Sequence, residues 1–263
     1  MRCIAHIVNL IVWDGLKLKN NLQAVERVRA TIKFVKNSPA RLQRLKDLVS
    51  VLKIERKSLL SLDVPTRWNS TYEMLETALK FKYVFSMFGL HKEIDLGDGE
   101  TSNIGPPEDS DWDLVRKLII FLERFFILTN NVSASLSVTA NSALFDISTA
   151  LETLKGLEEA SDLDLCVMAH KMKDKFNKYW GNLDKFNMLI YVAAILDPNV
   201  KIVGLQFTLH AMYGENDGDT LLCQIQQVTY ELFDEYKDYI RLLVSLFLSQ
   251  IVKVNLKLVT LNQ

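Results

Sequence analysis

The sequence has 263 residues, of which 49% are hydrophobic and 24% are charged, with 31 Lys and Arg against 32 Asp and Glu. This composition excludes an intrinsically disordered chain, because such chains have fewer apolar residues and a larger net charge. The 10 Gly and 5 Pro are too few for a collagen-like or linker-like chain, and they argue against a turn-rich all-β protein.

The near-zero net charge conceals an uneven distribution along the chain. Residues 1–92 contain 17 Lys and Arg against 7 Asp and Glu, whereas residues 93–263 contain 14 against 25. A basic third joined to an acidic remainder indicates a surface that meets a polyanion. The alternative interpretation is that amphipathic helices simply expose their charges to solvent, and the sequence does not decide between the two.

Apolar residues recur at helical spacing along most of the chain, which predicts a mainly α protein. In the first third, the pattern predicts helices near residues 4–12, 22–35 and 40–57. Ser70 and Glu73 have the spacing of a capping box, which predicts that the next helix begins at Ser70 and continues to about Phe88.

The stretch 93–111 is acidic and rich in Gly and Pro, which predicts a mobile surface loop. After it, Ser110 and Asp113 again have the spacing of a helix start. Further helices are predicted at 140–160, 163–181, 184–196, 202–213 and 220–239, with a turn at 214–218. Residues 241–263 contain no acidic residue and form an atypical apolar tail, which is either a helix docked on the core or a chain end set by truncation.

Sequence motifs of common enzyme sites are absent from this sequence. It contains no Gly-rich phosphate loop, no GxSxG and no HExxH, and its four His give no triad signature. Cys3-x-x-His6 and Cys166-x-x-x-His170 could together supply four zinc ligands, but the two pairs lie much farther apart in sequence than zinc-finger pairs usually do. The sequence therefore predicts no catalytic residue, no metal site and no cofactor.

The adjacent residues Arg67 and Trp68 are the most informative local pair. A Trp beside a cation in a turn can stack on a base while the cation holds a phosphate. Alternatively, Trp68 anchors the start of the following helix in the core, as large aromatic side chains commonly do. Phosphate binding is also predicted for Arg41, Arg44 and Lys46, which lie between the apolar positions of the preceding helix.

Three segments resemble motifs of plant hAT-superfamily transposases of the RICESLEEPER and DAYSLEEPER type, which carry a BED zinc finger. Residues 1–16, MRCIAHIVNLIVWDGL, resemble the segment with the family CxxH motif, so that Cys3 and His6 align with it. Residues 63–79 resemble the RW motif, and AAILDPNVK at 193–201 resembles the LDPR segment. The segments occur in the family order, and the resemblance extends over about residues 1–240.

The resemblance implies an RNase H-like core interrupted by a long helical insertion. Residues 1–68 are then expected to be a basic, helical remnant of the core, residues 69–240 an α-helical domain like the insertion, and residues 241–263 the atypical tail. In the family, two Asp upstream of the CxxH motif and one Glu downstream bind the metal ions that cut DNA. These positions have no counterpart in the sequence, so no transposition activity is expected.

The resemblance therefore implies a transposase-derived fragment that binds DNA in the nucleus without transposing it. The alternative functions are a helical protein-interaction scaffold or a non-functional transposon remnant, and a dimer with a second copy or with a full-length relative is left open. No membrane partner is expected, because the longest uncharged apolar stretch, residues 242–252, is too short to span a bilayer.

Overall fold

The computed structural model describes residues 3–53, 60–88, 94–95, 101–102, 105–134, 139–181 and 187–261. These residues contain eleven α-helices and one pair of two-residue strands, which confirms the prediction of a mainly α protein. The chain divides into two compact units, unit 1 at Met1–Phe186 and unit 2 at Asn187–Gln263. In the described part of the chain, no helix is both long and apolar enough to cross a membrane.

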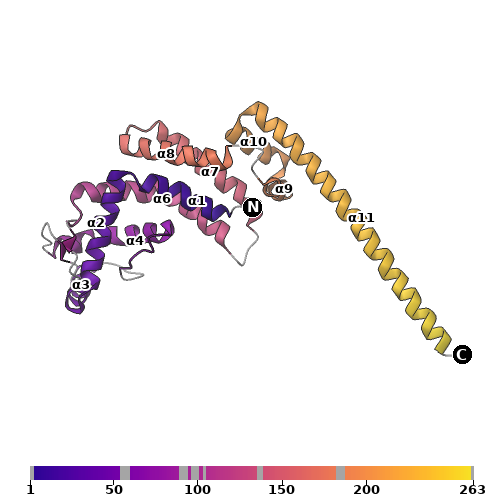
Figure 1. The fold of residues 1–263 in the computed structure, drawn as a ribbon, viewed down its shortest axis with the longest axis horizontal. Coiled ribbons are helices and arrows are strands. Elements are labelled where there is room, and N and C mark those ends of the chain that lie inside the picture. The colour runs from indigo at the N-terminus through magenta and orange to yellow at the C-terminus, as the bar shows by residue number, and fades with distance from the viewer. Residues whose placement is uncertain are drawn as a thin grey trace. The chain divides into compact units, whose positions relative to one another are not determined.

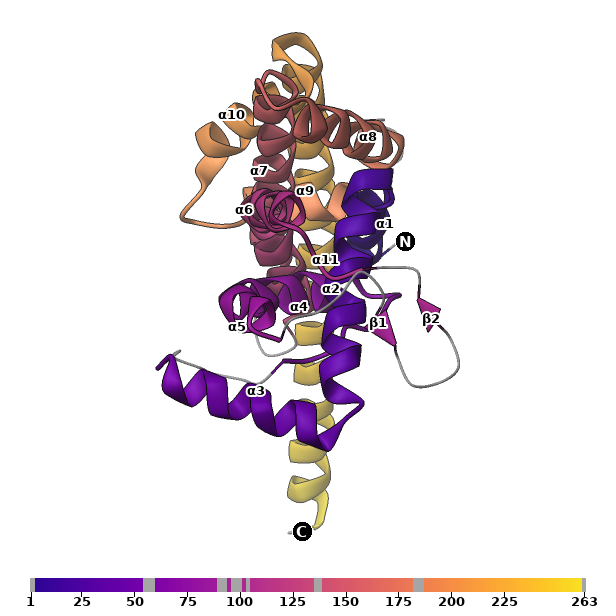
Figure 2. The same ribbon diagram turned by 90° about the vertical axis from the view of Figure 1, so that its left-hand side faces the viewer.

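Unit 1 is built from helices and one short strand pair. Its helices are α1 (Ile4–Leu16), α2 (Lys19–Lys36), α3 (Pro39–Val51), α4 (Trp68–Lys80), α5 (Lys82–Ser86), α6 (Asp109–Ser133), α7 (Ala140–Glu158) and α8 (Leu163–Trp180). Strands β1 (Ile94–Asp95) and β2 (Thr101–Ser102) pair antiparallel, with Ile94 opposite Ser102 (Figure 2). Of the predicted mobile loop at 93–111, the structure describes the two strands and residues 105–111, which include the start of α6, and the other residues lie outside the described ranges.

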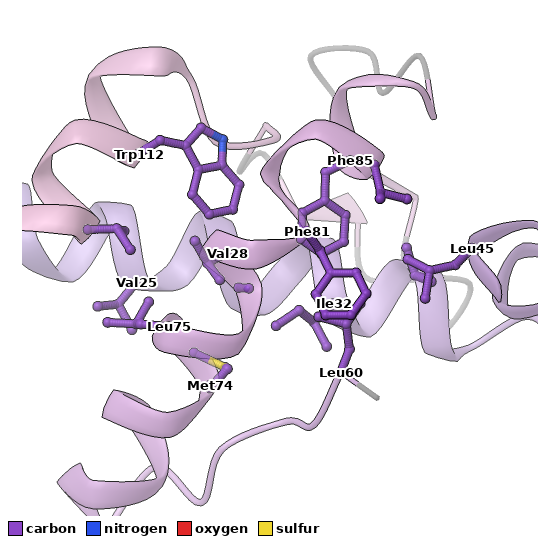
Figure 3. Packing of buried hydrophobic residues seen from close by; sticks show 14 of the residues in the cluster. Val25, Val28, Ile32, Leu45, Leu60, Met74, Leu75, Phe81, Phe85 and Trp112 are labelled. Carbon is purple, nitrogen blue, oxygen red and sulfur yellow. The ribbon is translucent and has the colours of Figure 1, made fainter. Parts of the chain in front are cut away.

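Helix α2 runs through the core of the first part of unit 1. Val25, Val28 and Ile32 lie at helical spacing and are 2%, 0% and 0% exposed. Figure 3 shows these side chains packed among aromatic residues, including Phe85 of α5 and Trp112 of α6. The rings of Phe85 and Trp112 stack with centroids 6.1 Å apart. This core holds α3, α4 and α6 against α2 and so places the basic helices.

The second part of unit 1 is a layer in which α1 packs against α6 and α8, and α7 packs against α6 and α8. At Gly15, α1 approaches α8 so closely that an added Cβ would lie 2.7 Å from Met172 Sδ and 2.9 Å from Met168 Cε. A side chain at position 15 would therefore displace the Met168 and Met172 side chains of α8. Residues 3–53 and residues 60–181 lie in one spatial unit. The division into a core remnant at 1–68 and an insertion-like domain at 69–240 stays a prediction.

The N-cap residue of helix α6, Glu108, lies two residues before the predicted N-cap, Ser110. Glu108 and Asp111 form a capping box, in which each side chain accepts a hydrogen bond from the other residue's backbone N–H, so that the first helical residue is Asp109. Arg27 of α2 donates to Asp111 at 2.7 Å. The start of α6 is therefore set by an acidic capping residue, Asp111, that is held by Arg27. The local sequence pattern did not show this contact.

Unit 2 contains α9 (Met188–Ile195), α10 (Lys201–Tyr213) and α11 (Glu215–Leu261). Helix α10 packs along the first part of α11, and α9 contacts both. Gly214, with φ +87°, ends α10, and α11 begins at the next residue, so the predicted turn at 214–218 is wrong beyond Gly214. Figure 1 shows α11 as one uninterrupted helix, which continues past the predicted end at residue 239 into the tail.

Candidate nucleic-acid interface

Helix α3 carries three of the predicted DNA-binding residues, Arg41, Arg44 and Lys46, which we call the α3 cations. The helix starts where Ser38 caps it by accepting a hydrogen bond from the Arg41 backbone N–H at 3.4 Å. Leu45 is 0% exposed and fixes the helix on the core. Arg44 is exposed, whereas Arg41 and Lys46 are half-buried.

Both arginines of α3 lie over aromatic rings. The guanidinium carbon of Arg41 is 3.8 Å from the ring centroid of Phe34 in α2, and that of Arg44 is 5.3 Å from the centroid of Phe88. Arg44 also donates an N–H to the carbonyl of Met87 at 3.3 Å. Stacking restricts the guanidinium but leaves the other in-plane N–H groups of Arg44 for a phosphate, since the aromatic ring occupies only a face of the plane.

The basic residues of unit 1 fall into two sets according to their partners. Residues held by acidic side chains are Arg27, Arg29, Lys80, Lys82, Arg116, Lys117, Lys173 and Lys175. The residues that make no ion pair within the described ranges include Arg41, Arg44, Lys46 and Arg67, together with other lysines such as Lys171 and Lys178 of α8. The charges of the second set are not neutralised by a described acidic neighbour, and this set contains all four of the basic residues that the sequence singled out.

Trp68 lies in the core rather than on the surface, since its side chain is 1% exposed. Its ring packs edge-on to Tyr72 and Phe126, with centroids 6.2 and 6.3 Å away. Its backbone N–H donates to Asn9 Oδ1 of α1 at 3.2 Å. In this conformation the indole cannot stack on a base, so a DNA contact by Trp68 stays a prediction that requires the ring to leave the core. The neighbouring Arg67 is exposed.

The start of α4 differs from the capping-box prediction, which placed it at Ser70. The helix begins at Trp68, with Arg67 as its N-cap residue. The Ser70 hydroxyl donates to the Arg67 carbonyl at 2.7 Å and accepts from the Val64 backbone N–H at 2.8 Å. Ser70 therefore closes the turn that precedes the helix instead of capping it.

A buried ion pair holds the RW segment to α2. Asp63, whose side chain is 0% exposed, accepts two hydrogen bonds from Arg29, from Nε at 2.8 Å and from a terminal nitrogen at 2.6 Å. Thr71 Oγ1 donates to the same carboxylate at 2.7 Å. Burial opposes ionisation of Asp63, but the hydrogen bonds from Arg29 and Thr71 and the positive charge of Arg29 together lower its pKa.

Sequence reasoning missed this pair, because Arg29 and Asp63 are far apart along the chain. Asp63 lies two residues before Pro65, ahead of α4, and Arg29 lies on α2, so no local pattern joins them. The charge of Arg29 is neutralised by Asp63, and the hydrogen bonds to that carboxylate raise the pKa of the guanidinium. The pair therefore has a structural role and positions Arg67 at the surface.

The residues of the CxxH motif lie at the start of α1, where Cys3 and His6 are both exposed. On α8, Cys166 Sγ lies 3.8 Å from His170 Nδ1. Across the described ranges, no three or more His, Cys, Asp or Glu residues come together in a way that could hold a metal ion. The four-ligand zinc arrangement considered from the sequence is thus not formed by these residues.

Comparison with known proteins gives two matches to family profiles. A profile described as "ZBED1 RNase-like helical domain" matches residues 1–120, and one described as "hAT-like transposase, RNase-H fold" matches residues 141–236. The assignment of residues 1–68 to a core remnant is finer than these matches and is not tested by them. No solved structure matches the chain.

Curated relatives match most of the chain. "Zinc finger BED domain-containing protein RICESLEEPER 2" of Oryza sativa subsp. japonica is 26% identical over 236 residues, covering 90% of this chain and 31% of the rice protein. "Putative AC transposase" of Zea mays is 31% identical over 226 residues, covering 82% of this chain and 25% of the maize protein. "Zinc finger BED domain-containing protein DAYSLEEPER" of Arabidopsis thaliana is 27% identical over 194 residues, covering 74% and 26%. The chain thus spans about a third of these relatives or less.

Proposed function

Because this chain is a hAT transposase-like protein, we propose that it binds duplex DNA and does not transpose it. The observation that carries the proposal is the set of α3 cations. Their charges have no acidic partner within the described ranges, and both arginines are pre-oriented by aromatic rings. Pre-oriented cations lose less side-chain entropy when they bind a phosphate, so they are better suited to this contact than free surface lysines.

The proposed binding is electrostatic and follows the DNA backbone rather than a base sequence. Each phosphate that a Lys or Arg neutralises releases condensed counterions, so the logarithm of the affinity falls with the logarithm of the salt concentration by about 0.9 per contact. Residues 1–92, with 17 Lys and Arg against 7 Asp and Glu, supply the charge for such a surface. Arg67 is exposed beside the turn that the Asp63–Arg29 pair holds, and we include it in the interface.

The test is a salt series of duplex binding by the purified chain. The double variant Arg44→Gln/Lys46→Gln is compared with Lys171→Gln/Lys178→Gln, which removes the same charge from exposed positions of α8. The proposal expects the α3 variant to lose about two units of slope, and the α8 variant to keep the wild-type slope. Equal losses in both variants, or no binding by the wild type at low salt, would refute the α3 surface.

Arg67→Gln tests the RW segment separately. We expect a loss of about one unit of slope, since one phosphate contact is removed. Substitution of Trp68 is not used for this purpose, because the buried ring supports the fold. An unchanged slope would remove Arg67 from the interface without affecting the α3 cations.

We also propose that this chain does not cut DNA. Metal-dependent strand transfer requires carboxylates that converge on the ions, and the described residues that carry carboxylates, imidazoles or thiols do not gather in groups of three or more suited to an ion. Supercoiled plasmid should remain uncut by the chain with Mg²⁺ or Mn²⁺. A nicking activity that co-purifies with the protein through two columns would contradict this. We place the protein in the nucleus with its DNA, which imaging of a fluorescent fusion checks.

A second candidate function is a helical protein-interaction scaffold. The observation that favours it is the row of large apolar side chains exposed along α11. Loss of this row should leave the salt slope of DNA binding unchanged, so the two functions are separable by experiment.

A further inference from the structure

The chain turns from α2 into α3 at the sequence Ser38-Pro39-Ala40-Arg41 (Figure 2). Ser38 is the only Ser or Thr of the chain that Pro follows, because the other four prolines come after Val64, Gly105, Pro106 and Asp197. Proline-directed protein kinases modify a Ser or Thr that stands before Pro, since Pro lacks the N–H that their substrate pocket leaves without a partner. Members of this class also favour a basic residue two positions after the Pro. Ser38 meets both requirements.

A purely structural account explains only part of this sequence. Ser38 is the N-cap of α3 and Pro39 is its first residue, and both residue types are preferred at these positions. A cap does not require Arg41, however. The cap is also weak, since the backbone nitrogen of Arg41 lies 3.4 Å from Ser38 Oγ, which is longer than a usual hydrogen bond. The Ser38 hydroxyl is therefore held loosely enough to react.

The backbone around Ser38 is suited to a kinase cleft. Ser38 has φ −130° and ψ 121°, which is the extended conformation in which kinases bind the residue that they modify. The flanking residues Lys36, Asn37, Pro39 and Ala40 are exposed, and Ser38 itself is half-buried. A kinase must also unwind the first turn of α3 to bind this segment. The ends of helices fray at a small cost in free energy, so the folded chain can present Ser38 to the enzyme.

A phosphate on Ser38 would enter a strongly basic environment. Residues 27–46 contain seven Lys and Arg and no Asp or Glu, and the first turn of α3 has no acidic residue to compensate the positive end of the helix dipole. Arg41 lies one turn along the helix from Ser38. Its Nη1 atom is buried and has no hydrogen-bond partner within the described residues. Phosphate oxygens are strong acceptors for such N–H groups, so the phosphate would be held against α3.

We propose that a proline-directed protein kinase phosphorylates Ser38 and that the phosphate switches off DNA binding by the α3 cations. The bond between Ser38 Oγ and the γ-phosphorus of ATP forms as the bond from that phosphorus to the ADP oxygen breaks, and the catalytic carboxylate of the kinase accepts the hydroxyl proton. A phosphoserine carries a charge of about −1.5 to −2 at pH 7, which offsets most of the positive charge of the three α3 cations. The switch rests on the proposed function, whereas the modification of Ser38 does not.

The first test is phosphorylation of the full chain by a purified cyclin-dependent kinase with its cyclin, ATP and Mg²⁺, read by mass spectrometry. Ser38→Asn removes the hydroxyl but keeps α3 capped, because Asn is as good an N-cap as Ser. Ser50→Asn, at the exposed far end of α3, is the matched control. We expect a single phosphate on Ser38 in the wild type and in S50N, and none in S38N. A wild type without phosphate on Ser38, or equal incorporation into S38N, would overturn the proposal.

The second test compares duplex binding by the phosphorylated and the unmodified chain in a salt series. We expect phosphorylation to lower the slope by about one unit, because the new phosphate takes up Arg41, and to weaken binding about tenfold at roughly 0.1 M salt. Ser38→Asp and S38N are a matched pair that keep the cap and differ by one charge, so S38D should bind DNA more weakly than S38N. Equal affinities of the phosphorylated and the unmodified chain would overturn the switch.

The two tests separate a failure of this inference from a failure of the proposed function. Phosphorylation of Ser38 is measured without DNA, so its outcome does not depend on the α3 surface. If the unmodified chain does not bind duplex DNA, the α3 surface and the switch are both refuted, but phosphate found on Ser38 still establishes the modification. If the unmodified chain binds DNA and Ser38 is not phosphorylated, only the present inference is overturned.

Discussion

Replacement of Asp63 by Asn removes the charge of the carboxylate that anchors the RW segment. The substitution keeps the size of the side chain and an oxygen that accepts from Thr71, but it leaves Arg29 beside a neutral amide. Loss of one partner from a buried ion pair destabilises proteins by about 3–5 kcal/mol. The Arg29 side chain is 25% exposed and can regain part of its hydration, so we expect about 2–3 kcal/mol.

The assay is urea unfolding followed by Trp fluorescence. All four Trp residues, at positions 13, 68, 112 and 180, lie in unit 1, so this signal reports the unfolding of that unit and is silent on unit 2. Lys80→Gln is the control, because the Glu76–Lys80 pair is 45% and 56% exposed and should contribute no more than about 0.5 kcal/mol. A loss below about 1 kcal/mol in D63N would refute the interpretation of Asp63 as an anchor.

The pH dependence of the same measurement has a defined sign. The pKa of Asp63 is lower in the folded chain than in the unfolded chain, so the pair stabilises the fold above the unfolded pKa of about 4. This contribution is lost as the pH falls through the folded pKa. The difference in stability between wild type and D63N should therefore be constant from about pH 5 to 8 and should shrink below about pH 4. A difference that grows on acidification would contradict the assignment.

Two further predictions concern other anchors of unit 1. Trp68→Ala should cost about 3–5 kcal/mol, because it removes a ring that is 1% exposed. Trp68→Phe should cost clearly less, since the buried Nε1 has no hydrogen-bond partner within the described residues. Equal losses of stability in thermal denaturation would show that the ring volume is not what matters. Asp162→Ala should cost about 1 kcal/mol more than Asp162→Asn, because both variants remove the ion pair of Asp162 with Lys117 but only Asn can still cap α8 by accepting from the Leu165 N–H. Urea midpoints that coincide for the two variants would exclude the cap.

Several features of the fold were accessible from local patterns. The spacing of apolar residues predicted α1, α2, α7, α8 and α10 within a few residues of their observed bounds, because an amphipathic helix must repeat its apolar side every three to four residues wherever it packs. The family resemblance was likewise carried by short segments. Helix ends were less accessible: the starts of α4 and α6 depend on contacts with residues outside each helix.

The predicted DNA-binding site also combines features set by the sequence and features set by the tertiary structure. The identity of the α3 cations, and the basic character of the first third, are properties of the sequence alone. Which cations remain unpaired is a property of the tertiary structure, since Arg29 is neutralised by Asp63 and Arg27 by Asp111 across long stretches of chain. Trp68 was open to two interpretations, and its burial against Tyr72 and Phe126 followed only from the packing of α4 on α6.

In helix α11, the sequence sets the pattern of residues and the tertiary structure sets their burial. The sequence alone determined that its charges are segregated, with all of its acidic residues before residue 239 and three of its four basic residues after it. Only the tertiary structure decided that Leu221 and Ile225 are covered while Phe233 and Ile240 are exposed. The physical reason is that periodicity specifies which face of a helix is apolar, whereas burial depends on whether another element is long enough to reach it.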